Sequence, residues 1–157
     1  MKEEWINAFA KMTYGIYVLT SRTDAAINAM IASWVSQVSY EPPLVMVAVH
    51  PNRYSHKLIM KGGAFALHVL ASTQANLLSQ FKGSNLKAKF ASLEWTTGKT
   101  GCPILKECLA YLECDLKTRY RPGNHTLFIG EVIAACVFAD EEPFTTLGYD
   151  GVYLGKV

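Results

Sequence analysis

Apolar residues recur along this chain in short runs, most of them as long as a β-strand. Runs rich in aromatic and β-branched residues and bounded by turn-forming residues predict strands. The predicted strands cover residues 14–20, 27–39, 44–49, 64–70, 108–120 and 126–138, with a short strand signal at 149–156. Apolar residues at helical spacing predict helices at 3–12, from 51 or 52 to 62–63, and at 74–81. Residues 83–89 and 93–101 show neither pattern and are expected to be irregular.

Turn signals indicate how these elements connect. The Glu-Pro-Pro triplet at 41–43 lies between two predicted strands, and neither proline can donate a ladder hydrogen bond, so the chain is expected to turn there. The Arg-Pro-Gly-Asn stretch at 121–124 separates the two longest strands and predicts a hairpin. Alternation in the first hairpin strand predicts one buried and one solvent-facing side. The buried side is expected to hold Leu112, Cys114 and Leu116, and the solvent-facing side Glu113, Asp115, Lys117 and Arg119.

The order of elements favours a mainly β fold. Consecutive strands are joined mostly by turns or single helices, without the regular alternation of strand and helix that a doubly wound sheet requires. No GxGxxG follows a strand, so the dinucleotide-binding fingerprint is absent. The pattern therefore predicts an antiparallel closed or half-closed barrel with a few short helices. The length suits a single domain over residues 1–157.

Composition narrows the class of protein. A net charge of +2 and scattered basic residues argue against a nucleic-acid binder. No apolar run approaches the roughly 18 residues of a membrane span, and the acidic start does not look like a signal peptide, so we expect no membrane contact and a cytoplasmic location. The four cysteines form no CxxC pair and no Cys-His metal pattern. They are expected to be buried thiols in a reducing compartment, with disulfides or zinc as the less favoured alternatives.

Candidate chemistry gathers around two short segments. Residues 52–55 begin a predicted helix, where backbone N–H groups, the helix dipole, Arg53 and Ser55 could bind a phosphate. The alternative is an ordinary capped helix with a solvated arginine. Residues 32–36 could bond the edge of a heterocycle through the backbone, with Trp34 packed beside it. The alternative is a core tryptophan among half-buried serines. No catalytic triad, HExxH, Walker loop or carboxylate pair accompanies them.

Histidines and lysines elsewhere leave similar choices open. His125 follows the predicted hairpin turn and could bond a ligand oxygen or simply the backbone. His68 lies in an apolar run and is expected to be a hydrogen-bonded core histidine. Lys87 and Lys89 follow a polar loop, and one of them could reach a phosphate. Lys89 is the better candidate because Phe90 would anchor its backbone.

Five segments together resemble a known family. MTYGIYVLTS, NAMIASWVSQVSYEPPLVMVAV, NRYSHKLI, GAFALHVL and NHTLFIGEV occur in the order found in the flavin reductase-like, FMN-binding split-barrel family, above all in flavoredoxin and the flavin domain of high-molecular-weight rubredoxin. The resemblance covers residues 8–155. It implies a Greek-key-like antiparallel split β-barrel, a homodimer, and one FMN, in preference to FAD, per protomer near the subunit interface.

The resemblance also implies a set of flavin-binding residues. Arg53 and Ser55 would meet the phosphate with Lys89 adding charge, while residues 32–35 would meet the ring edge or ribityl chain. The full implied set is Asn28, Met30, Ala32, Ser33, Trp34, Val35, Arg53, Ser55, Lys89 and His125. No catalytic side chain is assigned, since flavin N5 would carry the chemistry. His125 is the one possible contributor, and no metal ligand is expected.

The implied activity takes one of two forms. In the first, NAD(P)H reduces the bound FMN, and electrons pass to free flavin, a metal chelate or a protein. In the second, the protein is a flavoredoxin-type carrier that exchanges electrons with ferredoxin- or rubredoxin-like partners and has no direct NAD(P)H activity. The iron domain of some relatives is not expected here, because no CxxC pair follows residue 136. A haem- or pyridoxine-phosphate-binding barrel is disfavoured, the latter because it would need more arginines at the pocket.

Overall fold

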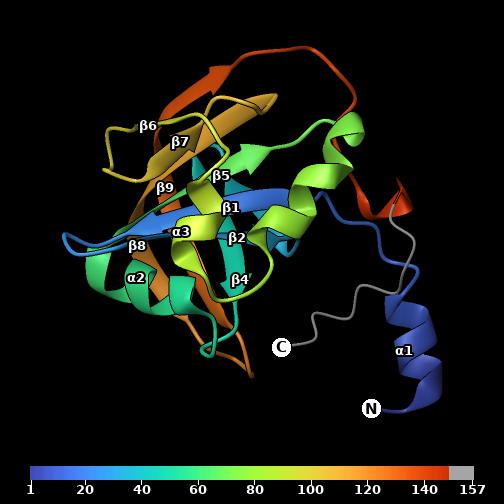
Figure 1. Cartoon of the computed structure of the whole chain (residues 1–157). Helices are drawn as coiled ribbons and strands as arrows, with labels where there is room; N and C mark the ends of the chain where they lie inside the picture. Colours follow the sequence, from blue (N-terminus) through green and yellow to red (C-terminus); the bar gives the residue numbers. More distant parts are fainter. Residues whose placement is uncertain (149–157) are drawn as a thin grey trace.

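The computed structural model describes residues 1–148 and is mainly β, as predicted (Figure 1). The strands are β1 Tyr17–Arg22, β2 Ile27–Ala32, β3 Val35–Ser39, β4 Leu44–Val49, β5 Ala64–Val69, β6 Trp95–Thr97, β7 Pro103–Leu105, β8 Ala110–Tyr120 and β9 Thr126–Val137. The α-helices are α1 Glu3–Phe9, α2 Tyr54–Gly62 and α3 Leu86–Phe90, and the 3-10 helices are η1 Ser72–Phe81 and η2 Thr146–Gly148.

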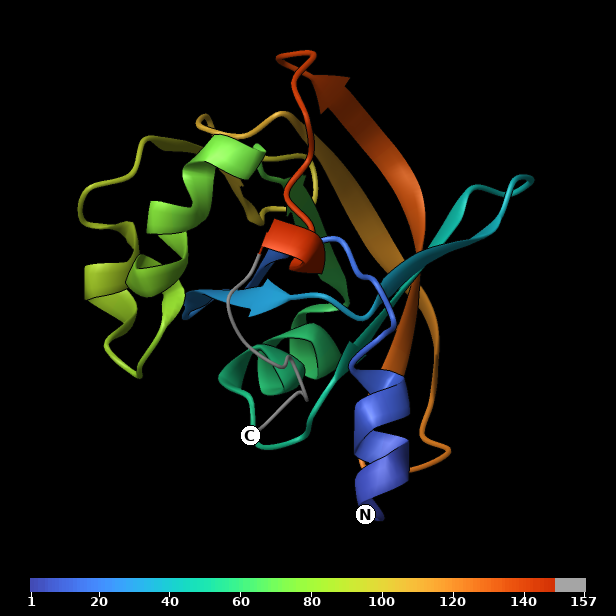
Figure 2. The ribbon, with the colours of Figure 1, turned by 90° about the vertical axis from the view of Figure 1, so that its right-hand side faces the viewer.

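Seven strands form one antiparallel sheet in the order β2-β1-β5-β8-β9-β4-β3. β2 and β3 follow each other in the chain but lie at opposite edges of the sheet. The sheet curls enough for β2 also to contact β4. Figure 2 shows the β3–β4 hairpin projecting away from the helices, and the chain crosses from one edge to the other at residues 33–34. The strand expected over 27–39 is therefore two strands, because the chain changes edges at its middle.

The curled sheet has two faces that pack against different layers. The inner face, which we define by Leu19, Val47, Phe65 and Phe128, packs around Ile59 of α2. The outer face, which carries Val18 of β1 and Ala29 of β2, packs against Leu78 and Phe81 of η1. Burying each large side chain of these clusters stabilises the fold by about 1.5–3 kcal/mol relative to exposing it. Both faces of β1 and β5 are covered, so nearly every residue of these strands is buried, including the polar Thr20, Ser21 and His68.

Helix α2 lies close against β1 because its last residue is glycine. A Cβ on Gly62 would lie 1.9 Å from the Arg22 carbonyl oxygen, so a larger residue would push the helix away. Gly63 then takes a left-handed conformation with φ +68° and ends the helix, as the sequence predicts. The start differs from the prediction. Arg53 is the N-cap residue, and the helix begins at Tyr54, later than the expected residue 51 or 52.

His68 is a hydrogen-bonded core residue, as predicted. Its Nε2 accepts a bond from the Leu105 N–H at 3.1 Å, so Nδ1 carries the proton and donates to the Val18 carbonyl at 3.0 Å. Burial lowers the pKa of His68 to about 4. The neutral imidazole thus ties β7 to the outer face of the sheet.

Two segments expected to be irregular contain short regular elements. Residues 83–89 include most of α3, whose first turn is capped by the Asn85 side chain accepting from the Ala88 N–H at 3.2 Å. Residues 93–101 include β6, which pairs with β7. These elements are too short for their periodicity to stand out. The first helix also ends earlier than predicted, at Phe9.

The hairpin of β8 and β9 is confirmed, but one predicted solvent-facing residue is buried. Glu113 is 2% exposed, and its Oε2 accepts bonds from the backbone N–H and the hydroxyl of Thr100, both at 2.8 Å. The outer face of β8 is covered here by the loop between β6 and β7. The alternation of side chains correctly placed Glu113 on the opposite face of the strand from Cys114. It could not reveal that the loop between β6 and β7 covers that face.

A bulge in β8 moves Arg119 to the face opposite Glu113, although its side chain is exposed to solvent, as predicted. Leu116 pairs with Gly130 and Thr118 with Ile129, so Lys117 is an extra residue in the strand. After the bulge Arg119 pairs with Phe128, whose ring lies in the inner core. Directly opposed residues point to the same face of a sheet, so Arg119 lies on the inner face and not beside Glu113.

Further sequence predictions can be compared with the described part of the chain. All four cysteines are free thiols, three of them buried and Cys136 half-buried. No helix within residues 1–148 is long and apolar enough to cross a membrane. In the same residues no group of histidine, cysteine or acidic side chains could hold a metal ion. The strand predicted at 149–156 lies outside the described residues.

Candidate functional site

A buried polar chain joins β2, α2 and α3. Lys89 Nζ donates to Asn28 Oδ1 at 3.1 Å and to the Ala29 carbonyl at 2.9 Å. Asn28 Nδ2 in turn donates to Ser55 Oγ at 2.9 Å. Lys89 is only 5% exposed, and Asn28 and Ser55 are buried too. Three predicted site residues, far apart in the sequence, therefore meet at one edge of the sheet.

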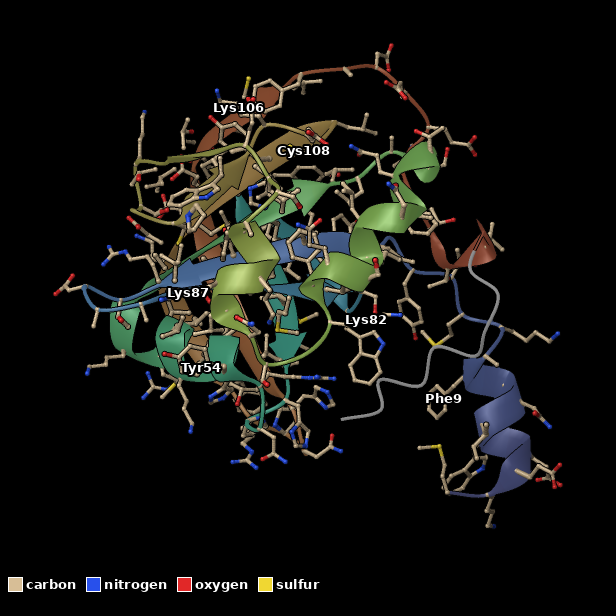
Figure 3. All side chains as sticks on the ribbon, viewed as in Figure 1. Phe9, Tyr54, Lys82, Lys87, Lys106 and Cys108 are labelled. Atoms are coloured by element: carbon tan, nitrogen blue, oxygen red, sulfur yellow. The ribbon has the colours of Figure 1, made fainter. Side chains whose placement is uncertain are left out.

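The two lysines of α3 point to different surroundings. Lys87, labelled in Figure 3, is exposed, whereas Lys89 turns toward the β2 edge. Burial, and then the positive charge of Arg53, lower the pKa of Lys89. Among residues 1–148 Lys89 forms no ion pair with a carboxylate. A buried ammonium without an anion is costly, so this arrangement suits a ligand that brings negative charge.

A second group consists of aromatic rings beside the crossing from β2 to β3. The Trp34 ring lies 4.7 Å from the ring of His125, and His125 lies 5.1 Å from His50, measured between centroids. The Trp34 carbonyl accepts a bond from the Ala48 N–H at 2.9 Å, which fixes its backbone against β4. Burial, followed by the charges of His50 and Arg53, lowers the pKa of His125. His125 is therefore mostly neutral at pH 7.

Unpaired polar atoms lie at this crossing. Ser33 Oγ and Trp34 Nε1 are buried, and neither makes a hydrogen bond within residues 1–148. Ser21 Oγ, on β1 directly opposite Asn28 and therefore toward the other end of β2, also makes no hydrogen bond within residues 1–148. Buried polar groups are nearly always hydrogen-bonded in native proteins, so unpaired ones indicate a missing ligand or water. Nothing in the sequence around Ser21 distinguishes it from an ordinary strand serine, and sequence reasoning missed it.

Arg53 connects the two groups electrostatically. Its charge lowers both the pKa of Lys89 and the pKa of His125. It occupies the N-cap position of α2 and makes no side-chain capping bond to the helix. The Arg53 charge therefore acts on both the lysine group and the aromatic group.

The remaining predicted residues lie along the same β2–β3 segment. Ala32 is buried in the inner core, and Met30 and Val35 are half-buried against it. Their side chains therefore contribute to packing. Only their backbone N–H and C=O groups are left to make polar contacts with a ligand. The ten predicted residues come from β2, the crossing, β3, α2, α3 and the start of β9.

Comparison with known proteins identifies the family. The family model "Flavin reductase like domain" matches residues 9–154. The chain belongs to the flavin reductase-like family.

Named relatives are consistent with this membership. The chain is 33% identical to high molecular weight rubredoxin of Moorella thermoacetica, covering 94% of this chain but only 66% of that protein. It is 32% identical to ferric-chelate reductase (NAD(P)H) of Archaeoglobus fulgidus, covering 96% of this chain and 92% of the relative. A crystal structure of an NADH:FAD oxidoreductase of Streptomyces globisporus, in complex with NAD and FAD fragments, superposes with a TM-score of 0.81 at 29% identity, covering 88% of this chain and 83% of that one.

The site of this flavin reductase-like chain fits a flavin. The unpaired Ser33 hydroxyl and Trp34 indole N–H can bond polar ring atoms or a ribityl hydroxyl. Lys89 and Arg53 carry positive charge that would suit a phosphate. Described residues of this chain thus offer suitable partners for both ends of the cofactor.

Proposed function

We propose that this protein is an FMN-dependent NAD(P)H oxidoreductase built as one flavin reductase-like domain over residues 1–157. The proposal rests on one observation about β2 and the residues that follow it, made within residues 1–148. Lys89, which has no carboxylate partner there, is buried against Asn28, and Ser33 and Trp34 just after the strand hold buried polar atoms with no hydrogen bond. NAD(P)H activity is a property named for the Archaeoglobus relative, and NADH for the Streptomyces protein. Their identity and coverage support the same chemistry in this chain.

The phosphate end would be held by Lys89, Arg53 and Ser55. Asn28 bonds both Lys89 and Ser55, so it fixes their positions before a ligand arrives. Charge-assisted bonds from an ammonium and a guanidinium are the strongest available to a phosphate. FMN ends in a single phosphate that matches this compact group. FAD is the alternative, supported by the FAD fragments in the Streptomyces structure.

The ring end would be held by Ser33, Trp34 and His125, with Met30, Ala32 and Val35 packing behind the β2–β3 backbone. When bound, flavin supplies a hydride-accepting centre at N5. The protein's part is to bind, to orient and to keep water out. His125 Nδ1 lies 2.8 Å from Asn124 Oδ1 and donates to it, so neutral His125 presents Nε2 as an acceptor near Trp34. That nitrogen could accept a bond from a ring N–H or a ribityl hydroxyl without adding charge.

The arrangement of the sheet supports a split barrel. β2 and β3 lie at opposite edges of a curled antiparallel sheet, and β2 also contacts β4 across the gap. We propose that this gap is the split of the barrel and that the flavin lies along it, since Ser33 and Trp34 are the residues that cross it.

We further propose that the protein is a homodimer, with apolar surfaces of the described chain covered by a second copy. Helix α1 has no buried residue, and it stands apart from the sheet in Figure 1. An apolar recess of about 380 Å³ opens on the inner face, with Tyr17, Leu112 and Val132 among its lining residues. A seven-residue helix is not stable alone, so its apolar side requires a partner surface.

An electron-carrier role is the second candidate. High molecular weight rubredoxin, a relative by sequence, is longer than this chain, which covers 66% of it. A carrier would exchange electrons with a rubredoxin- or ferredoxin-like protein through the same flavin.

The cellular location stays a prediction. Four free thiols and, for the oxidoreductase candidate, dependence on an NAD(P)H pool both fit a cytoplasmic location.

Anaerobic titration of the flavin-loaded protein tests the proposal and separates the two candidates. Protein loaded with FMN should be yellow and should lose its visible flavin absorbance when NADH or NADPH is added. Bleaching by a reduced low-potential redox protein, with none by millimolar NADH or NADPH, would favour the carrier. Failure to retain any flavin would overturn both candidates.

A further inference from the structure

Two exposed arginines lie at the end of β8, close enough to His56 of α2 for their charges to act on it. Arg119 pairs with Phe128, so it lies on the inner face of the sheet. Arg121 follows Tyr120, the last paired residue of β8.

The bulge at Lys117 creates this placement of Arg119. Without the extra residue, Arg119 would lie on the outer face, together with Glu113 and Asp115. Lys117 instead stays on the outer side, where it pairs with Glu131 at 2.6 Å. Bulges re-aim side chains and are common beside functional sites.

His56 marks where the arginines meet the flavin site. Its Nε2 lies 2.8 Å from Thr126 Oγ1, and its ring packs 5.0 Å from the Phe128 ring. His56 follows Ser55 directly, and His125 precedes Thr126, so two proposed flavin-binding residues are its chain neighbours. The corner formed by His56, Arg119 and Arg121 thus lies next to the proposed flavin site.

The corner carries positive charge without a balancing acid. Burial and then the charges of Arg121, His50 and Arg119 lower the pKa of His56. The ion pairs within residues 1–148 are Arg22–Asp24, Lys106–Glu94 and Lys117–Glu131, and none involves Arg119 or Arg121. Figure 3 shows nitrogen-bearing side chains gathered at this end of the molecule, near the labelled Tyr54. The net charge of the chain is only +2, so such a local excess is not a general property of its surface.

We propose that Arg119 and Arg121 bind the 2′-phosphate of NADPH and make NADPH the preferred electron donor. This inference rests on the proposed function, because it concerns the dinucleotide that reduces the bound flavin. A pair of guanidinium groups presents two forks to a single phosphate. NADH lacks the 2′-phosphate and gains nothing from the pair. A small anion suits the corner better than an acidic protein, since only two arginines, two residues apart in the chain, supply the charge.

Steady-state kinetics of the double variant Arg119→Gln/Arg121→Gln test the selectivity. The KM for NADPH should rise about tenfold or more, while the KM for NADH and the kcat with either donor stay within twofold. Lys61→Gln, at the far end of α2, removes one exposed positive charge and serves as the control. Equal changes for NADPH and NADH, or none in either, would overturn the inference.

A binding measurement separates this inference from the activity. Calorimetry on the FMN-loaded protein should show adenosine 2′,5′-bisphosphate binding at least tenfold more tightly than adenosine 5′-monophosphate, and the difference should vanish in the double variant. This readout needs no electron transfer, so it stands even if neither dinucleotide bleaches the flavin. If the double variant instead loses affinity for the flavin, the corner belongs to the cofactor and the inference is wrong.

Discussion

At the scale of single residues, Lys89 joins stability to the proposed cofactor binding. It saturates the Ala29 carbonyl on an edge strand and orients Asn28, yet no carboxylate within residues 1–148 neutralises it. Burying such a charge costs desolvation free energy, and binding of an anionic ligand offsets that cost. The lysine therefore has a structural role in the fold, and we propose that it has an electrostatic role in binding the flavin.

Replacing Lys89 by methionine should expose both roles. Two buried acceptors lose their donor, so the flavin-free protein should lose about 1–3 kcal/mol of unfolding free energy. The folded protein should also bind FMN at least tenfold more weakly, because a charge-assisted phosphate bond is gone. Urea unfolding and fluorescence titration measure the two effects. Exposed Lys87→Met is the matched control and should change neither. An unchanged FMN affinity in Lys89→Met would refute the phosphate assignment.

Local sequence predicts some of these residues and not others. The preference for Lys89 over Lys87 followed from the apolar neighbour that anchors its backbone, and the structure buries Lys89 alone. The unpaired Ser21 hydroxyl was not predictable, because its lack of a partner depends on β2 and α2 packing around it. Whether a buried polar atom has a hydrogen-bond partner depends on its three-dimensional surroundings. The periodicity of a strand carries no information about those surroundings.

At the scale of elements, His68 acts as a clamp between β1, β5 and β7. Its two ring nitrogens bond the Val18 carbonyl and the Leu105 N–H, so the clamp requires the neutral form. Protonation would turn Nε2 into a donor facing another donor. The pKa of about 4 in the folded state lies below the unfolded value near 6.5, so the unfolded chain binds more protons between these limits.

Stability should therefore fall as the pH falls from about 6.5 to 4, by roughly 3 kcal/mol from this group. Urea unfolding at several pH values measures the slope. His68→Gln should be less stable at pH 7, because one clamp bond is lost, but its stability should depend less steeply on pH. The lowered pKa values of His56 and His125 act in the same direction in both proteins, so the difference in slope isolates His68. Parallel pH profiles would contradict the clamp.

Element boundaries show where sequence periodicity stops being informative. The β8–β9 hairpin follows from a clear alternation and a clear turn, and both are present. Alternation fails at the bulge, because one extra residue at Lys117 reverses the side of everything after it. It also cannot tell a solvent-facing side from a side covered by another layer, as with Glu113.

At the scale of the whole molecule, the mainly β class and the antiparallel sheet were predictable, because turn signals join the strands directly. That β2 and β3 would lie at opposite edges was not, since the 27–39 run is continuous in its apolar pattern. The separation is a consequence of closing the sheet. It also places Ser33 and Trp34 at the crossing, where the proposed flavin site lies.

The proposed dimer can be tested by substitutions in α1. Trp5 and Phe9, four residues apart on α1, share one side of the helix and are 54% and 51% exposed, and Met12 just beyond the helix is 52% exposed. If a second copy covers them, the double variant Trp5→Ser/Phe9→Ser should shift the protein from dimer to monomer at micromolar concentration, as measured by size exclusion with light scattering. Asn7→Ser changes a polar residue of the same helix and should leave the dimer intact.

The same variant asks whether dimerisation and flavin binding are coupled. If the cofactor lies near the subunit interface, the monomeric variant should bind FMN more weakly, and added FMN should restore part of the dimer, because linkage is reciprocal. Normal FMN affinity in a monomer would place the flavin within one subunit. An unchanged dimer would mean that α1 is not at the interface, and the apolar recess near Tyr17 and Val132 would then be the surface to mutate next.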